Sequence, residues 1–292
     1  MQAVAQFYDL GWHTVKSIDK MRLRARLVEP DWSALRYLAM DEFALHKGHR
    51  YATVVVDPLN PQVLWIGLGR SRETARAFFE QLPEGVAARI EAVAIDMTTA
   101  YELEIKAHCP QADVVYDLFH VVAKYGREVI DRMRVDQSQS IAIRQTRPAS
   151  IEIESLAVVA QPPQPQCTAV NPSERTARGQ RANEPLTCVY VLRDELKHLW
   201  FYRRLAWAEK AWKQWFEQAY QSGISALQQF AQRLQGYLHG ILSRCRHPLN
   251  TSAVEGINNT IKVIKRRAYG YRDDEYFFLK IRAAFPGKAR GT

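Results

Sequence analysis

Three acidic residues stand where a protein could use them to hold a divalent cation. Asp41 lies inside the apolar, strand-like run "AMDEF", where a buried acid is costly unless it binds a cation or pairs with a base. Asp96 ends the run "VAID", at the carboxyl edge where open α/β sheets place their ligands. Glu255 opens a basic, amide-rich helix. Three oxygen donors converging there would suit Mg²⁺ or Mn²⁺, and a pair of such ions can activate a water or a 3′-hydroxyl against a phosphodiester.

Two of these acids also have a structural interpretation. Ser252 and Glu255 have the spacing of a capping box, in which the Glu side chain reaches back to a backbone N–H at the helix start. On this stretch alone, both interpretations of Glu255 stand. Asp96 could cap the next helix, but Thr99 and Glu102 are spaced as a capping box of their own, which leaves Asp96 free.

A second polar pair follows the next strand-like run, "VVYDLFH". The run ends with Asp117 and, three residues later, His120. A histidine near a strand end is more often structural than catalytic, so the residues alone do not decide its role.

The helix that contains Glu255 has an apolar and a polar face. At helical spacing the apolar face consists of Val254, Ile257, Ile261 and Ile264. We assign Glu255, Asn258, Asn259 and Lys262 to the opposite face. The chain has 40 Lys and Arg against 31 Asp and Glu, a net charge of +9, and residues 262–292 hold about two thirds of this excess. Such a basic end favours a polyanionic partner. The residues predicted here to follow a DNA backbone are Asn258, Asn259, Lys262, Lys265, Arg266, Arg267 and Arg272.

The N-terminal residues 1–27 are typical of a helix-turn-helix. Asp9 and Gly11 supply the break, and Ala5, Val15 and Ile18 should pack the two helices together. The second helix would then present its DNA-facing residues, namely His13, Thr14, Lys16 and Ser17. A plain amphipathic hairpin is the alternative.

The middle of the chain alternates between strand and helix patterns. Period-two, β-branched runs predict an antiparallel meander of three strands, at 35–45, 51–58 and 62–69. Helix, strand, helix and strand patterns follow at 71–82, 90–96, 98–109 and 112–119. This order predicts an α/β fold with a ribonuclease-H-like mixed sheet, built from 34–120 and 250–285.

Residues 121–249 are predicted to form a large helical insertion domain. Its tryptophans, Trp200, Trp207, Trp212 and Trp215, are expected to pack between helices rather than stack on bases. The segment 144–187 differs, because it carries six prolines and no aromatic residue. We expect an irregular, exposed loop there.

The four cysteines stand far apart without a C-x-x-C pair, which argues against a disulfide framework and a cysteine zinc site. No apolar run approaches the ~18 residues of a membrane span, and the N-terminus has no signal-peptide pattern. We therefore expect a cytoplasmic protein.

Three stretches resemble the signature blocks of bacterial insertion-sequence transposases of the ISL3 family. They are "AMDEFALHKGHRYATVVVD", "AIDMTTAYELEIKAHCPQADVVYDLFHVVAKYGREVIDRMR" and "HPLNTSAVEGINNTIKVIKRRAYGYRD". The resemblance implies an Asp-Asp-Glu transposase in which Asp41, Asp96 and Glu255 are the catalytic, metal-binding acids. Asp117 and His120 match an Asp-x-x-His element near the active site of related transposases. The implied cofactor is Mg²⁺ or Mn²⁺, and the implied partners are double-stranded transposon ends, target DNA and further copies of the chain in the DNA complex.

The chain departs from the family pattern in two places. Family members usually begin with a cysteine-containing zinc-binding segment ahead of the helix-turn-helix, so this chain is expected to be N-terminally truncated. Residues 144–187 also lack the helical family sequence. These departures favour an alternative, a catalytically inactive remnant that only binds DNA, whereas the three acids favour the enzyme. A structure-selective nuclease on the same core is a third possibility.

Overall fold

The computed structural model describes residues 2–46, 48, 50–136, 177–249 and 252–287. The chain divides into two compact units. We call Met1–Asp117 with His247–Thr292 the sheet unit, and Leu118–Arg246 the helical unit. The described part of the chain contains no helix long and apolar enough to cross a membrane.

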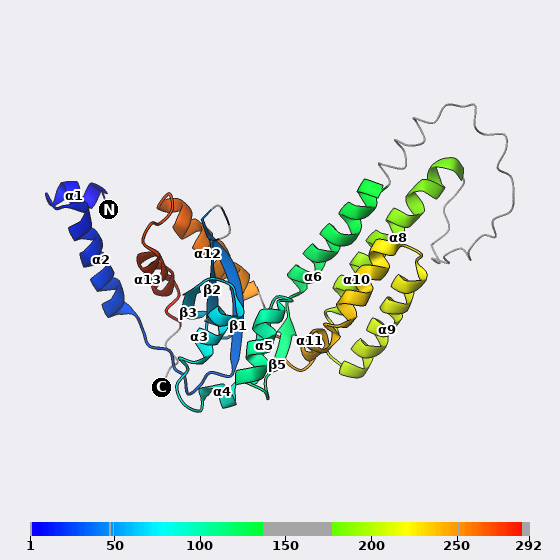
Figure 1. The fold of residues 1–292 in the computed structure, drawn as a ribbon, viewed down its shortest axis with the longest axis horizontal. Helices are drawn as coiled ribbons and strands as arrows, with labels where there is room; N and C mark the ends of the chain where they lie inside the picture. The colour runs from blue at the N-terminus through cyan, green and yellow to red at the C-terminus, as the bar shows by residue number, and fades with distance from the viewer. Residues whose placement is uncertain (1, 47, 49, 137–176, 250–251, 288–292) are drawn as a thin grey trace. The chain divides into compact units, whose positions relative to one another are not determined.

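The sheet unit is built on a five-stranded mixed sheet with the order β3-β2-β1-β4-β5 (Figure 1). Strands β1 to β3 pair antiparallel, whereas β1, β4 and β5 run parallel. The strands are β1 (Tyr37–His46), β2 (Arg50–Asp57), β3 (Gln62–Leu68), β4 (Ala92–Ile95) and β5 (Asp113–Tyr116). All five were predicted, and the α/β class is confirmed.

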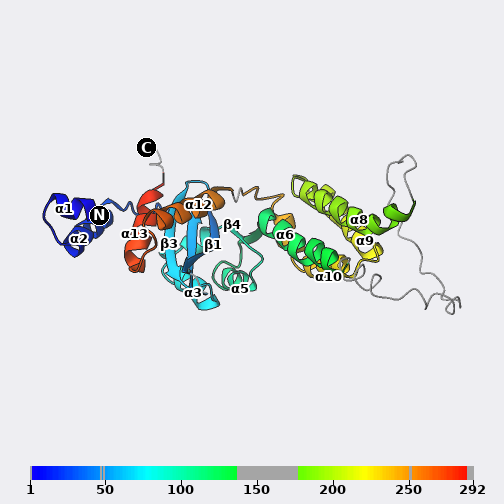
Figure 2. The same cartoon turned by 90° about the horizontal axis from the view of Figure 1, so that it is seen from above.

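Helices cover both faces of this sheet, as Figure 2 shows for α12 on one side of the strands and α3 and α5 on the other. Alternate side chains of β2 point to the two layers: the Thr53 hydroxyl lies 2.9 Å from the Tyr101 hydroxyl of α5, while Val54 belongs to the core under α12. The helices are α3 (Arg72–Phe79), α4 (Val86–Arg89), α5 (Thr99–His108), α12 (Ser252–Arg267) and α13 (Asp274–Ala284).

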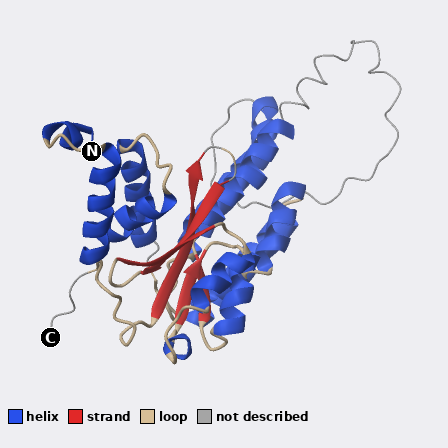
Figure 3. Ribbon diagram, turned by 60° about the vertical axis from the view of Figure 1, so that its left-hand side comes forward, coloured by secondary structure: helices blue, strands red, loops and turns tan. Residues whose placement is uncertain are grey.

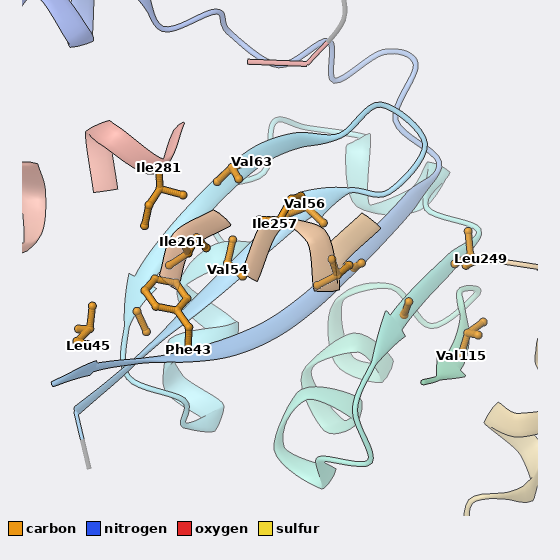
Figure 4. Packing of buried hydrophobic residues seen from close by; sticks show 14 of the residues in the cluster. Phe43, Leu45, Val54, Val56, Val63, Val115, Leu249, Ile257, Ile261 and Ile281 are labelled. Carbon is orange, nitrogen blue, oxygen red and sulfur yellow. The ribbon is translucent and has the colours of Figure 1, made fainter. Parts of the chain in front are cut away.

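The core between the sheet and α12 explains why α12 returns to β1 after the helical unit. Val254, Ile257 and Ile261 are 5%, 2% and 1% exposed, and Figure 4 shows Ile257 and Ile261 lying over Val54 and Phe43. Burying each such side chain stabilises the fold by roughly 1.5–3 kcal/mol. The predicted apolar face of α12 is confirmed, with Val254, Ile257 and Ile261 buried and Ile264 packed against the same cluster.

Two N-terminal helices, α1 (Gln2–Phe7) and α2 (Trp12–Arg26), are separated at the predicted break. Asp9 there has a left-handed backbone, with φ of 50°. Ala5 and Val15 are buried as expected, but Ile18 is 40% exposed, so its predicted packing against α1 is wrong. On α13, α2 finds polar partners as well, such as Lys280, whose ammonium lies 2.7 Å from the Asp19 carboxylate.

The described part of the helical unit is built from helices, which Figure 3 draws in blue. They include α6 (Leu118–Tyr125), the π-helical turn η1 (Gly126–Ile130) with helical residues 131–136 after it, α8 (Ala177–Leu199), α9 (Leu205–Gln221), α10 (Ser225–Gln235) and α11 (Leu238–Ser243). Trp200, Trp212 and Trp215 are buried, and Trp212 forms edge contacts with both of the others. Trp207 is 61% exposed, so its predicted role in packing is wrong.

The irregular loop predicted at 144–187 is wrong for its last part. Residues 144–176 lie outside the described residues, but 177–187 belong to α8, with Pro185 inside the helix. Most of "ARGQRANE", at 177–184, consists of residues that favour helices, although it lacks an apolar period. A helix already fixed by buried Val189, Leu192 and Leu196 can extend through such a segment without a new nucleus.

Candidate functional site

Asp41 and Asp96 point to the same side of the sheet at the same level. Ala39 and Phe43, two residues to either side of Asp41, pack into the core beneath α12, so the alternation of the strand directs Asp41 to that side. The parallel register pairs Ala39 of β1 with Ala94 of β4. Two residues further along each strand, Asp41 and Asp96 are therefore neighbours.

Asn258 connects α12 to this pair of acids. Its amide Nδ2 donates a hydrogen bond to Asp41 Oδ2 at 2.5 Å, and the residue is only 9% exposed. The assignment of Asn258 to an exposed, DNA-facing side of α12 is therefore wrong. Asn258 follows Val254 by four residues, and this spacing returns to the same face of a helix.

Two oxygen atoms at this place are buried without a hydrogen-bond partner among the described residues. They are Oδ1 of Asp96 and Oδ1 of Asn258. A buried polar atom left unsatisfied costs about 1–3 kcal/mol, so folded proteins rarely retain one without a reason. Asp41 and Asp96 supply carboxylates and Asn258 an amide oxygen, a donor set that fits Mg²⁺ or Mn²⁺.

Glu255 lies on α12 three residues before Asn258, and its side chain is exposed. No three His, Cys, Asp or Glu side chains within the described ranges lie close enough together to hold a metal ion. Glu255 thus does not join Asp41 and Asp96 in a three-carboxylate cluster in this structure. Its other predicted role, the capping box with Ser252, depends on a side chain outside the described residues. The function of Glu255 stays a prediction.

Asp117 is close to the end of β4, because its backbone N–H donates to the Ile95 carbonyl at 3.2 Å. It is half-buried directly after β5. His120 belongs to α6 of the helical unit and is also half-buried. The roles predicted for Asp117 and His120 stay predictions.

The predicted capping box at the start of α5 is wrong, although the conclusion drawn from it holds. The N-cap residue is Thr98, which makes no side-chain cap hydrogen bond. Glu102 turns inward instead and accepts a hydrogen bond from the Tyr116 hydroxyl at 2.6 Å. Asp96 nevertheless keeps an oxygen without a partner among the described residues.

The predicted DNA-facing residues of α2 divide into two groups. His13, Thr14 and Ser17 are exposed. Lys16 is half-buried and donates to Asp273 Oδ2 at 2.9 Å, at the start of α13. This hydrogen bond from Lys16 is the main reason that the pKa of Asp273 falls to about 2. Lys16 is therefore held against α13 in this structure.

The basic end of α12 divides in the same way. The Lys265 ammonium is half-buried and donates to the Ala44 carbonyl of β1 at 3.0 Å. The other residues predicted to meet DNA here are exposed: Asn259, Lys262, Arg266, Arg267 and Arg272. Lys262 donates to Asn259 Oδ1 at 3.5 Å, on the same exposed face of α12. Exposed side chains can meet a phosphate backbone without leaving a contact with the sheet.

Comparisons with known proteins show similarity to transposases along most of the chain. The ISL3 transposase family, whose description is "Transposase", matches residues 38–281. The transposase for insertion sequence element IS1001 of Bordetella parapertussis is 72% identical over 293 residues, which is 99% of this chain and 71% of that protein. The transposase for insertion sequence element IS1557 of Mycobacterium tuberculosis (strain H37Rv) is 25% identical over 292 residues, covering 94% of this chain and 65% of that protein.

Proposed function

Because the chain belongs to the ISL3 family of transposases, we propose that it cuts the ends of its element by metal-dependent hydrolysis and joins the 3′-hydroxyls to target DNA. The observation that carries this proposal is the pairing of Asp41 and Asp96 at one level of the sheet, with an unpartnered, buried oxygen on Asp96. An acid needed only for structure would be expected to have that oxygen satisfied.

We infer a ribonuclease-H-like architecture from the topology of the sheet. A three-stranded antiparallel meander is extended on the β1 side by two parallel strands in the order β3-β2-β1-β4-β5. Asp96 directly follows β4, at the carboxyl edge where α/β sheets present ligands.

Mg²⁺ or Mn²⁺ would activate the attacking water or 3′-hydroxyl and stabilise the leaving oxygen of the phosphodiester. Asp41 and Asp96 would hold the cation. Asn258 keeps Asp41 in place through the 2.5 Å hydrogen bond and offers its own buried amide oxygen. Glu255, one helical turn before Asn258, would complete the set of acids.

The exposed polar residues would place the DNA. His13, Thr14 and Ser17 form the outward face of a proposed helix-turn-helix. Arg266, Arg267 and Arg272 would neutralise phosphates beside the proposed metal site. We also propose that copies of the chain assemble on DNA, because a transposase acts on two ends of one element.

A cleavage and joining assay tests this function directly. The full chain is incubated with Mg²⁺ or Mn²⁺ and labelled DNA that carries the ends of its own element. We expect nicking at the ends and joined products from the wild-type chain. Asp41→Asn and Glu255→Gln should lose both products while retaining DNA binding, because an amide keeps the shape but lacks the charge that holds the cation. The matched control is Glu217→Gln, on the exposed surface of α9.

Two outcomes would contradict the proposal. A wild-type chain that binds its DNA ends but never cuts them would instead be a DNA-binding remnant. Near-normal cutting by Glu255→Gln would show that Glu255 serves α12 as a cap and is not a metal ligand.

A further inference from the structure

The turn between α8 and α9 exposes large apolar side chains that the helical unit does not use in its core. Phe201 is 68% exposed and Trp207 is 61% exposed, with Tyr202 and Leu205 at 38% and 39%. We call residues 201–207 the aromatic turn. In the same unit Trp200, Trp212 and Trp215 are at most 3% exposed. The unit thus buries its other tryptophans and leaves this one in solvent.

The aromatic turn is also positively charged. Arg203 and Arg204 lie within it and are exposed. The thiol of Cys245 donates to the Tyr202 carbonyl at 3.3 Å, which brings the segment after α11, with Arg244 and Arg246, beside the turn. Glu209 of α9 also lies near Cys245. The first turn of α9 contains no acid, and its backbone N–H groups add further positive potential.

This combination selects one kind of partner. Phosphates of a regular duplex are neutralised by Lys and Arg alone, since the bases are stacked inside. Exposed aromatic rings interleaved with arginines match unstacked bases, because the rings stack on the base faces while the guanidinium groups pair with the backbone. An apolar protein partner would have to desolvate the exposed guanidinium groups of Arg203 and Arg204 without offering them a counter-charge.

We propose that the aromatic turn binds unpaired nucleotides, such as those at a frayed or cleaved DNA end, with Trp207 and Phe201 stacking on bases and Arg203 and Arg204 holding the phosphates. This proposal depends on the proposed function in one respect, namely that the ligand is DNA. It assigns the helical unit a binding role that is separate from the acids of the sheet unit.

The test is a binding measurement with the full chain in EDTA, so that no DNA is cut. One probe is a duplex with a short unpaired 3′ tail that carries 2-aminopurine, whose fluorescence falls when an aromatic ring stacks on it. The other is the same duplex with blunt ends. We expect Trp207→Ala to bind the tailed probe about tenfold more weakly and to abolish the quenching, with blunt-end binding unchanged.

Conservative and control variants separate stacking from folding. Trp207→Phe should restore most of the tailed-probe affinity and the quenching, because phenylalanine still offers a ring. Val191→Ala, which changes an exposed side chain of α8, should behave as the wild type on both probes. Arg203→Ala should weaken binding of the tailed probe and lower its salt dependence.

Equal loss on both probes in Trp207→Ala would overturn the inference, as would wild-type quenching in that variant. Weaker self-association of Trp207→Ala in sedimentation, with DNA binding intact, would show that the turn contacts another protein chain. A chain that binds neither probe would contradict the proposed function as well.

Discussion

Acids on the two sides of the same sheet differ in the groups that compensate their negative charge. On the face covered by α3 and α5, the Glu104 side chain is only 1% exposed and is clamped by guanidinium groups from α3. Arg76 Nη2 lies 3.1 Å from Glu104 Oε1, Arg72 contacts the same carboxylate, and His108 Nε2 lies 3.3 Å away. The hydrogen bonds from Arg76 and then Arg72 hold the pKa of Glu104 at about 2.

On the face covered by α12, Asp41 accepts hydrogen bonds from neutral donors, which include the Asn258 amide and the backbone N–H of Glu42 at 2.7 Å. Asp96 keeps one buried oxygen without a partner in the described part of the chain. Burying a carboxylate is costly unless a cation or several donors compensate for lost water. On the face covered by α3 and α5, the compensating cations are protein side chains, Arg72 and Arg76. On the α12 face, that unpartnered oxygen of Asp96 is the reason to propose an external metal there.

The largest effect should come from removing the charge of Asp96. We expect Asp96→Asn to lower the rate of DNA cleavage by about 1,000-fold or more, because a metal contributes several kcal/mol to the transition state. Its thermal stability should equal or exceed that of the wild type, since a carboxylate with one buried, unpartnered oxygen becomes neutral. Cleavage rates and thermal unfolding of the same preparation provide the measurement. A marked loss of stability would mean that Asp96 is a structural acid like Glu104.

Glu104→Gln should show the reverse pattern, with cleavage retained and stability reduced. The free energy of unfolding at pH 7 should fall by about 2 kcal/mol, a value discounted because Arg72 and Arg76 are 45% and 43% exposed. The lowered pKa means that the wild type has this stabilisation above about pH 4.5 and loses it as the pH falls toward 2.

Denaturant titrations between pH 7 and pH 2 would therefore show the two proteins converging as the acid limit is approached. A constant difference across that range would indicate that packing, and not the ion pair, causes the loss.

Asn258→Ala tests whether the neutral partner positions Asp41. We expect cleavage to fall by about 10- to 100-fold, the usual effect of removing a residue that orients a metal ligand. Raising the Mn²⁺ concentration should recover part of the activity if the defect lies in metal affinity. Asn259→Ala, on the exposed side of the same helix, is the matched control. Equal effects of the two substitutions would place Asn258 in DNA contact after all.

The smallest expected effect is on the salt dependence of DNA binding. The basic side chains of α12 show the same contrast between groups paired inside the protein and groups exposed to solvent. Arg266→Ala should reduce the slope of log binding constant against log salt by about 0.9, as expected for one lost phosphate contact. Lys265→Ala should change the slope less, because its ammonium already donates to the Ala44 carbonyl. Filter binding to one duplex over a range of salt concentrations compares them. Equal slopes in the two variants would mean that Lys265 leaves Ala44 when DNA binds.

The secondary structure of the sheet unit could be predicted well because its signals are local. Alternation of β-branched residues marked β1 to β5, and the spacing of Val254, Ile257 and Ile261 marked the buried face of α12. The helical start of α8 was missed, since 177–184 carries helix-forming residues without an apolar period. Asp41 and Asp96 were correctly expected on adjacent strands, whereas Asn258 was assigned to the wrong face of α12; the metal-binding role of the acids stays a prediction.

The sequence by itself determined the strands, the helices of the sheet unit, the basic end of the chain and the candidate acids, because each depends on neighbours a few residues away. Only the tertiary structure decided which charged groups are satisfied internally. Asn258 and Asp41 are 217 residues apart, and Lys16 and Asp273 are 257 apart. Such contacts depend on how α12 and α13 dock after the helical unit, a choice made by the whole apolar core and not by any local pattern.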